Sequence, residues 1–380
     1  MFQPSYWDKS EILDDIDVCI IGSGIVGLSA ACHLAKSNSK LRILVLERGP
    51  LPYGASTRNA GFACYGSPGE IIDDLTHESR DIVYSRIEER YLGIQKLRSL
   101  FTDNQLDYRE FGGYEIFKNN DQAEFQKCTD QLDNLNQELH SIFKKNIFEH
   151  VTGDLSNIGI NNMHSAIRIN IEGQLNAGKM MRSFINLATS LNVRIMNGIE
   201  VGKVIPESDR TTITTKNGFE INSKSCIIAV NGFAKQFLPD LDVAPARAQV
   251  LVTEPVANLK LKGTYHYNKG FTYFRNIGNQ ILIGGGRDLD INGETTTELD
   301  TTAKIQDHLE SFLNTHLLPG NLKVDIDHRW SGIMGVGNSK TPVVKEVNQG
   351  MFCAVRLGGM GVAIGCTAGE KVANLALQRF

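Results

Sequence analysis

Residues 17–47 read DVCIIGSGIVGLSAACHLAKSNSKLRILVLE. This stretch begins with a short apolar run, turns at Gly22-Ser23-Gly24-Ile25-Val26-Gly27, and continues as an Ala/Leu-rich segment of helical composition. A second apolar run, residues 41–46, ends in Glu47, which lies 20 residues after the last glycine of the turn. Strand, glycine turn, helix, strand and acid at this spacing predict a dinucleotide-binding βαβ unit.

Each glycine of this turn has its own expected role. Gly22 permits the tight turn, Gly24 lets backbone N–H groups approach a pyrophosphate at the helix N-terminus, and Gly27 lets helix and strand pack closely. Glu47 is expected to accept hydrogen bonds from ribose hydroxyls. The alternative is a tight structural turn without a ligand, but both flanking strands and the acid favour cofactor binding.

A second glycine loop lies near the other end of the chain. It comprises Gly358 to Gly361, follows a strand predicted over residues 351–356, and opens a helix predicted from residue 362. Two such loops at opposite ends predict one cofactor contacted from both, and therefore a discontinuous first domain. Between them, the spacing of apolar residues predicts helices over residues 69–101 and 121–144.

Composition excludes several classes of protein. The 380 residues have a net charge of -4 and no long basic run, which argues against a nucleic-acid partner. The seven cysteines are scattered without a CxxC pair, and no secretory signal is visible, so we expect a cytoplasmic protein. No segment is apolar enough to predict a membrane span, and no histidine spacing predicts a metal site.

Several segments together resemble a known family. The N-terminal unit, the loop GASTRNAG (residues 54–61) and the segment RLGGMGVAIG (residues 356–365) resemble the FAD-dependent D-amino-acid oxidase superfamily, which includes glycine, sarcosine and related amine oxidases. Within it, DHRWSG (327–332), YFR (273–275) and GGG (284–286) are most similar to the gamma-glutamylputrescine oxidase type. The resemblance covers nearly the whole chain.

This resemblance implies an α/β protein of two domains. The first is a discontinuous, Rossmann-like FAD-binding domain of residues 1–80, 150–240 and 325–380. The second is an α+β substrate-binding domain built on an antiparallel sheet, residues 81–149 and 241–324. The implied cofactor is FAD, and we expect it to be noncovalent because the cysteine that links flavin in the sarcosine-oxidase branch has no counterpart here.

At the second glycine loop, the resemblance implies that a helix N-terminus stabilises negative charge on the flavin. The positions that the resemblance assigns to FAD come from every part of the first domain. They are Gly22, Gly24, Ile25, Val26 and Gly27 at the pyrophosphate; Glu47 and Arg48 at the adenosine side; Ser56, Thr57, Arg58, Asn59, Ala60 and Gly61 along the path to the flavin; Val201, Ala229, Asn231 and Gly232 at the adenine end; and Gly359, Met360, Gly361, Val362 and Ala363 along the flavin ring.

The sequence departs from the family pattern at three positions. Glycine-oxidase-like members use two arginines to pair a substrate carboxylate, and the corresponding positions here are Met334 and Gly359. Sarcosine-oxidase-like members place a lysine near the flavin to assist oxygen, and the equivalent here is Leu282. A carboxylate clamp of that design is therefore not expected, and oxygen as the electron acceptor loses one of its supports.

Four residues are candidates for the substrate side. Arg275 would bind a carboxylate or a gamma-glutamyl tail, or else form a structural ion pair with a residue such as Asp288. Tyr273, with Tyr265, would form an aromatic wall, or else belong to the core. Trp330 would pack near the flavin or be a buried anchor, and Met360 would form an apolar pocket floor or pack in the ordinary way.

The implied activity is oxidation of the C–N bond of an amine or amino acid to an imine, which water then hydrolyses. The expected partners are this small substrate and an electron acceptor, either oxygen, which gives hydrogen peroxide, or another carrier; the oligomeric state stays open. The alternatives are a dehydrogenase with another acceptor, a noncatalytic flavin-binding protein and an NAD-linked dehydrogenase, of which the glycine loops at both ends make the last less favoured than an FAD enzyme.

Overall fold

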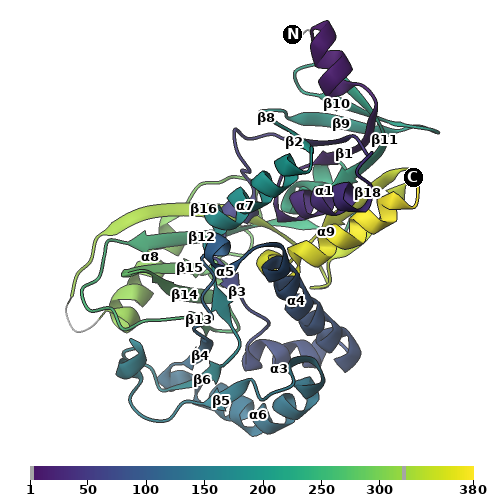
Figure 1. Ribbon diagram of the computed structural model, residues 1–380. Helices are drawn as coiled ribbons and strands as arrows, with labels where there is room; N and C mark the ends of the chain where they lie inside the picture. Colours follow the sequence, from purple (N-terminus) through teal and green to yellow (C-terminus); the bar gives the residue numbers. More distant parts are fainter. Residues whose placement is uncertain (1–3, 319–321) are drawn as a thin grey trace.

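The protein, seen in a computed structural model that describes residues 4–318 and 322–380, contains two eight-stranded sheets and a two-stranded one. Figure 1 shows the two large sheets side by side, with both chain ends on the side of the first. The architecture confirms the predicted α/β class with a second, sheet-based part.

The first sheet grows from the βαβ unit that the sequence predicts. Its strand order is β17-β18-β11-β1-β2-β8, and β9 and β10 extend β11 as an antiparallel ribbon. Neighbours from β18 to β8 are parallel, and most residues of β1, β2 and β18 are buried, which explains their nearly continuous apolar sequences. The strands are β1 (Ile16–Ile21), β2 (Ile43–Glu47), β8 (Arg194–Asn197), β9 (Val201–Pro206), β10 (Thr211–Thr215), β11 (Glu220–Ile228), β17 (Val343–Asn348) and β18 (Met351–Val355).

Helices from both ends of the chain meet on this sheet. Helix α9 (Gly361–Leu377) packs along α1 (Ile25–Ser37), and α4 (Arg80–Leu100) packs on α9 (Figure 1). The contacts are close: a Cβ at Gly369 would lie 2.7 Å from the Val26 carbonyl oxygen, and a Cβ at Gly93 would lie 1.8 Å from that of Ala363. Gly369 therefore lets α9 lie against α1, and Gly93 lets α4 lie against the start of α9.

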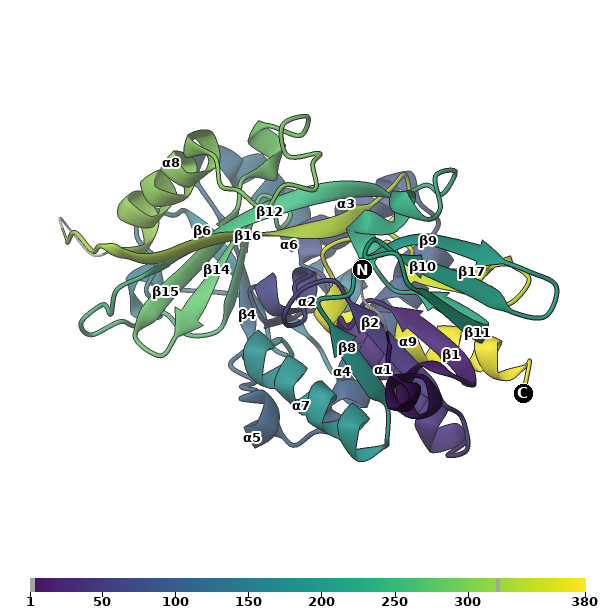
Figure 2. The same ribbon diagram turned by 90° about the horizontal axis from the view of Figure 1, so that it is seen from above.

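The second sheet has the order β16-β12-β15-β14-β13-β4-β6-β5. It is antiparallel except between β13 and β4, which run parallel. The long strands β12 and β16 reach from this sheet toward β9, β10 and β17 (Figure 2). The strands are β4 (Gly113–Phe117), β5 (Phe148–His150), β6 (Ser165–Ile169), β12 (Ala244–Thr253), β13 (Thr264–Tyr267), β14 (Thr272–Ile277), β15 (Gln280–Gly285) and β16 (Ile326–Val336).

The predicted helix over residues 69–101 is two helices. α3 (Pro68–His77) begins at Ser67, whose hydroxyl accepts the Glu70 N–H, and α4 begins after Ser79. Glu78 and Ser79 have extended backbones, which break the helical run. The other elements are α2 (Ala55–Arg58), β3 (Phe62–Ala63), α5 (Asp103–Leu106), α6 (Gln122–Phe143), β7 (Gly173–Gln174), α7 (Ala177–Ser190) and α8 (Ala303–Phe312).

The pairing of two strands and the packing of one helix differ from the predicted domain ranges. β6 and β16 fall in ranges assigned to the FAD-binding domain, yet both pair within the second sheet. Conversely, α4 falls almost wholly in a range assigned to the substrate-binding domain and packs on α9. Chain order alone could not show this, because β16 is the partner of β12 across more than 70 residues of intervening sequence. Within the described ranges, no helix is both long and apolar enough to cross a membrane.

Candidate functional site

A cavity of about 580 Å³ lies where the first sheet, its two glycine loops and the second sheet meet. Its lining comes from the starts of α1 and α9, the end of β2, the loop of residues 54–61 and strands β12 to β16. In a parallel α/β sheet, the carboxyl ends of the strands are the usual place for a ligand. The topology therefore places a ligand site at the predicted position.

The first glycine turn is held by close backbone contacts. Gly22 has φ +103°, and a Cβ there would lie 2.7 Å from the Ala229 carbonyl oxygen. A Cβ at Gly27 would lie 2.0 Å from the Gly22 carbonyl oxygen, which is far inside van der Waals contact. Gly27 is therefore required for packing between helix and turn, and it does not itself line the cavity.

Glu47 fixes the turn and keeps capacity for a ligand. Its side chain is buried; Oε2 accepts hydrogen bonds from the Ser23 N–H (3.1 Å) and hydroxyl (2.8 Å), and Oε1 accepts one from the Gly49 N–H (3.0 Å). A carboxylate has about four acceptor sites, so these three bonds leave room for a ribose hydroxyl. Glu47 lines the cavity, as its predicted role requires.

The loop of residues 54–61 closes over the start of α1. The Ser56 hydroxyl accepts the Ile25 N–H at 2.9 Å, and the Asn59 amide oxygen accepts the Gly61 N–H at 2.8 Å. Arg58 reaches the second sheet, where its Nη1 donates to the Ser331 carbonyl at 3.0 Å. The loop thus connects the first glycine turn with the second sheet.

The second glycine loop presents unpartnered donors to the cavity. Gly358 (φ +55°) and Gly359 (φ +83°) turn the chain into α9, and Asn231 holds the preceding segment by accepting the N–H groups of Arg356 and Leu357. Among the described residues, the N–H groups of Gly361 and Val362 have no acceptor, as expected in the first turn of a helix. Two helix N-termini therefore face one cavity, which suits a long ligand with negative charge.

Most of the residues predicted to bind FAD line this cavity. The exceptions are Gly27, Thr57, Gly61 and Gly232; the three glycines are tightly packed, and a Cβ at Gly232, for example, would lie 2.3 Å from the Met334 carbonyl oxygen. The lining members are Gly22, Gly24, Ile25, Val26, Glu47, Arg48, Ser56, Arg58, Asn59, Ala60, Val201, Ala229, Asn231, Gly359, Met360, Gly361, Val362 and Ala363. The glycine cradle, the free N–H groups and the buried carboxylate together fit a dinucleotide such as FAD.

Of the four predicted substrate-side residues, two line the cavity and two do not. Tyr273 and Met360 line it, and burial raises the pKa of the Tyr273 phenol to about 12, so it stays neutral. Its proposed companion Tyr265 is fully buried between Tyr114 and Phe274, with ring centroids 4.9 Å away on each side. Tyr265 is thus a core residue, and of the two tyrosines only Tyr273 lines the cavity.

Arg275 and Trp330 lie outside the cavity lining. Arg275 Nη2 donates to the Leu175 carbonyl at 3.0 Å, and the Leu175 N–H donates to the Gly61 carbonyl at 2.8 Å, so Arg275 braces the end of the 54–61 loop. Burial lowers the pKa of Arg275 to about 10. The alternative partner Asp288 accepts from Asn268 instead. Trp330 donates Nε1–H to the Arg58 carbonyl at 2.9 Å.

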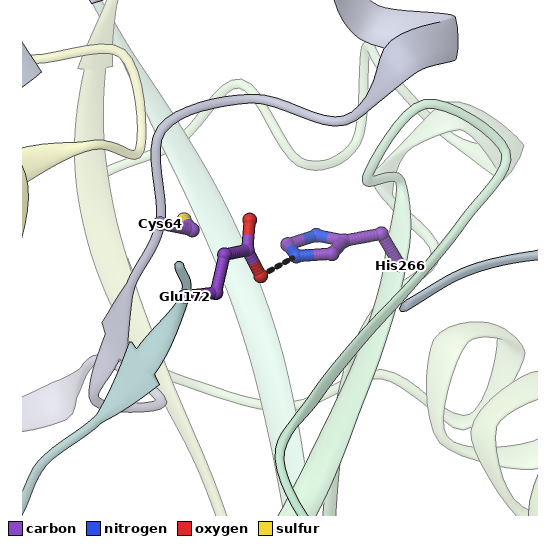
Figure 3. A group of neighbouring side chains, drawn as sticks. All are labelled: Cys64, Glu172 and His266. Atoms are coloured by element: carbon purple, nitrogen blue, oxygen red, sulfur yellow. Dashed lines mark hydrogen bonds and ion pairs between the residues drawn. The ribbon is translucent and has the colours of Figure 1, made fainter. Parts of the chain in front are cut away.

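Three residues that the sequence did not single out as a group lie together at the cavity wall. Cys64, Glu172 and His266 offer ligand atoms within 4.8 Å of one another (Figure 3). His266 Nε2 forms a 2.8 Å hydrogen bond with Glu172 Oε2, which also accepts the Thr264 hydroxyl at 2.5 Å. Cys64 and His266 line the cavity, whereas Glu172 is fully buried. Positions about 100 residues apart gave no local signal of this contact.

The His266 ring is surrounded by acids. Burial lowers its pKa, but the charges of Glu172, Glu115 and Glu70 and the bond to Glu172 outweigh this, so the pKa of His266 is raised. Within the described part of the chain, Nδ1 has no hydrogen-bond partner. Burial raises the pKa of the Cys64 thiol well above its ordinary value, so the thiol stays protonated. Cysteine, glutamate and histidine side chains also suit a metal ion. The expectation from the sequence that the protein has no metal site therefore stays a prediction.

Glu115 gives the pH dependence of stability a definite sign. Its carboxyl is buried and accepts the Gly69 N–H at 2.7 Å, and burial raises its pKa to about 7. The folded state then binds this proton more tightly than the unfolded chain, so the free energy of unfolding falls as pH rises from about 4.5 to 7, by about 3 kcal/mol at most. Glu115→Gln should remove part of this loss: its unfolding temperature should fall less between pH 5 and pH 8 than that of the native protein. An identical fall in both proteins would contradict the assignment.

Comparison with known proteins agrees with this geometry. The family model for FAD dependent oxidoreductases, DAO, matches residues 17–375. Probable oxidoreductase OrdL of Haemophilus influenzae is 23% identical, covering 96% of this chain and 84% of the relative, and gamma-glutamylputrescine oxidoreductase of Escherichia coli is 25% identical, covering 94% and 83%. The crystal structure of glycine oxidase from Geobacillus kaustophilus superposes with a TM-score of 0.74 at 20% identity, covering 95% of this chain and 94% of that one.

The family match spans both glycine loops, the 54–61 loop and both sheets. It therefore includes every segment that lines the cavity. The chain belongs to the family of FAD-dependent oxidoreductases, the DAO family, and its cofactor is FAD.

Proposed function

We propose that the protein oxidises the C–N bond of a small amine or amino acid to an imine, which water hydrolyses to a carbonyl compound and ammonia or a shorter amine. The observation that carries this proposal is the continuity of one cavity from the residues that fit FAD to Tyr273 and His266 on the second sheet. The similar proteins named for gamma-glutamylputrescine and glycine oxidation support a substrate of this class.

The reaction removes a hydride from carbon and requires an uncharged nitrogen beside it. Bound FAD supplies the acceptor for the two electrons and the proton that leave as hydride. The chain must therefore orient the C–H bond, exclude water and take a proton from the substrate ammonium. Val250, Met334 and Met360 contribute apolar lining that excludes water from the substrate end.

His266 is the residue that we assign to the proton. Its Nε2 is occupied by Glu172, which leaves Nδ1 to accept a proton from the substrate nitrogen. The neighbouring carboxylates raise the pKa of His266, and a more basic imidazole takes a proton from an ammonium more readily. The charge that appears on the ring is balanced by Glu172.

The acceptor after the first half-reaction is oxygen or another carrier. The position that carries a lysine in sarcosine-oxidase-like proteins is Leu282, which is buried and packs with Ala60, Val250 and Val252. No cation of this design assists oxygen at that position. A dehydrogenase that passes electrons to another carrier is therefore the second candidate. In both candidates, FAD is held without a covalent bond to the protein.

A spectral experiment tests the proposal. The purified protein should be yellow, and a panel of amines and amino acids added without oxygen should include at least one that bleaches the flavin absorbance. Acid denaturation should release FAD from the protein. A flavin that dithionite bleaches but no amine does would contradict C–N oxidation. Readmitted oxygen then separates the acceptors: fast recovery with hydrogen peroxide indicates an oxidase, and slow recovery without it a dehydrogenase.

A further inference from the structure

The positively charged side chains that line the cavity differ in whether they already have a partner, and this difference bears on the substrate. Lys269 pairs with Asp73 at 2.6 Å, and Lys340 pairs with Asp74 at 2.5 Å. Arg58 donates to backbone carbonyls, and Arg48 stacks on Phe233 with its guanidinium carbon 4.0 Å from the ring centroid, at the end beside Glu47. Within the described ranges, Arg287, like Arg48, has neither a hydrogen bond nor an ion pair, and unlike Arg48 it stacks on no aromatic ring.

The acids nearest to Arg287 are already engaged. Glu294 forms a two-bond ion pair with Arg247, through Nε and Nη2 at 2.8 Å each, and also accepts from Gln249 at 2.9 Å. Asp288 accepts from the Asn268 amide, and Asp290 pairs with Lys304 and accepts the Gly293 N–H. Glu294 lies close enough to oppose the lowering of the Arg287 pKa that burial causes. The acid nearby thus offers Arg287 electrostatic support without a hydrogen bond.

The backbone that carries Arg287 is built for its position. Gly285 (φ +115°) and Gly286 (φ +74°) lie in the left-handed region, where other residues are strained. A Cβ at Gly285 would lie 1.9 Å from the Phe271 carbonyl oxygen, which accepts the Gly286 N–H at 2.7 Å. β15 is therefore tied to the end of the β13–β14 hairpin, and Arg287 follows immediately at the cavity wall.

Arg287 is half-buried and lines the cavity; its Nε–H is closed off from solvent without an acceptor, and within the described residues its two terminal nitrogens, which remain open to a ligand, form no hydrogen bond. A buried donor without a partner costs about 1–3 kcal/mol, and a guanidinium presents its donors as a fork that matches a carboxylate. We infer that Arg287 is the site where the cavity binds an anionic group of its ligand, a carboxylate of the substrate. This inference rests on the proposed function, because it takes the ligand to be the substrate of that reaction. The substrate is then an amino acid or another amine that carries a carboxylate.

This site is distinct from the two positions at which related oxidases carry their carboxylate-binding arginines. Those positions, Met334 and Gly359, face each other here: a Cβ at Gly359 would lie 3.3 Å from the Met334 sulfur. They form an apolar part of the lining, whereas Arg287 enters from the end of β15. The carboxylate is therefore recognised from a different strand.

Binding of simple probes to the FAD-loaded protein tests the inference without turnover. Acetate and its neutral analogue acetamide are titrated while the flavin absorbance and the heat of binding are recorded. The native protein should bind acetate more tightly than acetamide. Arg287→Met should raise the Kd for acetate about 10- to 100-fold and leave acetamide unchanged, and Arg287→Lys should fall between, because lysine keeps the charge but not the two-bond geometry.

Lys304→Met is the matched control, because it removes the same charge from exposed α8, outside the cavity lining. It should leave the acetate Kd unchanged. Equal losses in Lys304→Met and Arg287→Met, an unchanged Kd in Arg287→Met, or a native protein that binds neither probe would each overturn the inference. Acetate binding that depends on Arg287 in a protein that no amine reduces would instead refute only the proposed C–N oxidation.

Discussion

Gly27→Ala is expected to abolish FAD binding. The added Cβ would lie 2.0 Å from the Gly22 carbonyl oxygen and 3.1 Å from its carbonyl carbon, so either the turn or the first turn of α1 must move. Gly22 is itself fixed, because its N–H donates to the Leu46 carbonyl at 2.8 Å and the preceding Ile21 carbonyl accepts the Ala229 N–H at 2.9 Å. The purified variant should contain less than about a tenth of the native FAD per chain, measured from the visible absorbance after denaturation.

Gly54→Ala is the control for this prediction. Gly54 also lines the cavity, but it has φ -85° and nothing within 4 Å of the position of a Cβ. Its FAD content should equal that of the native protein. A Gly27→Ala protein with full FAD content would show that the turn can shift without loss, and would contradict the close-packing role.

The cofactor half of the site could be predicted from sequence because its signals are local. Gly22, Gly24 and Glu47 lie within one βαβ unit, and the chemistry of a helix N-terminus and a buried acid needs only that unit. The second glycine loop carries the same local signal at Gly358 to Gly361. The sequence alone could not show that the two glycine loops lie together, because this depends on the packing of α9 along α1.

The substrate half could not be predicted, because it is assembled by sheet pairing. His266 pairs with Tyr273, and Tyr273 with Gly284, so three separate stretches of sequence face the cavity as neighbours. Alternation along β14 places Arg275 on the same face as Tyr273, yet that face extends past the cavity to Gly61 and Leu175. Period-two alternation indicates a face of the sheet, and only the structure shows where on that face the cavity ends.

Arg287 is another residue whose role could not be predicted from the sequence. The run that precedes it, Gly284-Gly285-Gly286, was visible in the sequence as one of the segments that carry the family resemblance. The absence of an ion-pair partner was not, since Asp288 and Asp290 lie beside it in the chain and suggest charge neutralisation. Within the described residues, the guanidinium has no ion-pair partner because Asp288 is engaged by Asn268, Asp290 by Lys304 and Glu294 by Arg247.

His266→Phe is expected to lower kcat by about 10²- to 10⁴-fold, the usual contribution of a proton-transfer residue. Phenylalanine keeps the ring packed against Phe62, whose centroid lies 5.5 Å from that of His266, but it cannot accept a proton. The rate of anaerobic flavin bleaching by the best amine found is the measurement. FAD content should be unchanged, because His266 lies on β13 of the second sheet, whereas the glycine turn of residues 22–27 belongs to the first. A bleaching rate equal to that of the native protein would remove His266 from the reaction.

Glu172→Gln separates a proton-transfer role from a structural one. Removing the Glu172 charge takes away the largest of the influences that raise the pKa of His266, so the imidazole loses its proton at lower pH. The acid side of the kcat/KM profile should therefore move to lower pH, while the maximal rate falls because the base is weaker. Thr264→Val, which removes only the hydroxyl donor to Glu172, should leave that pH unchanged or raise it slightly. If the Glu172 pair only held the fold together, both variants would lose stability and neither would move the profile, whereas a shift confined to Glu172→Gln requires the ionisation of His266 to control the rate.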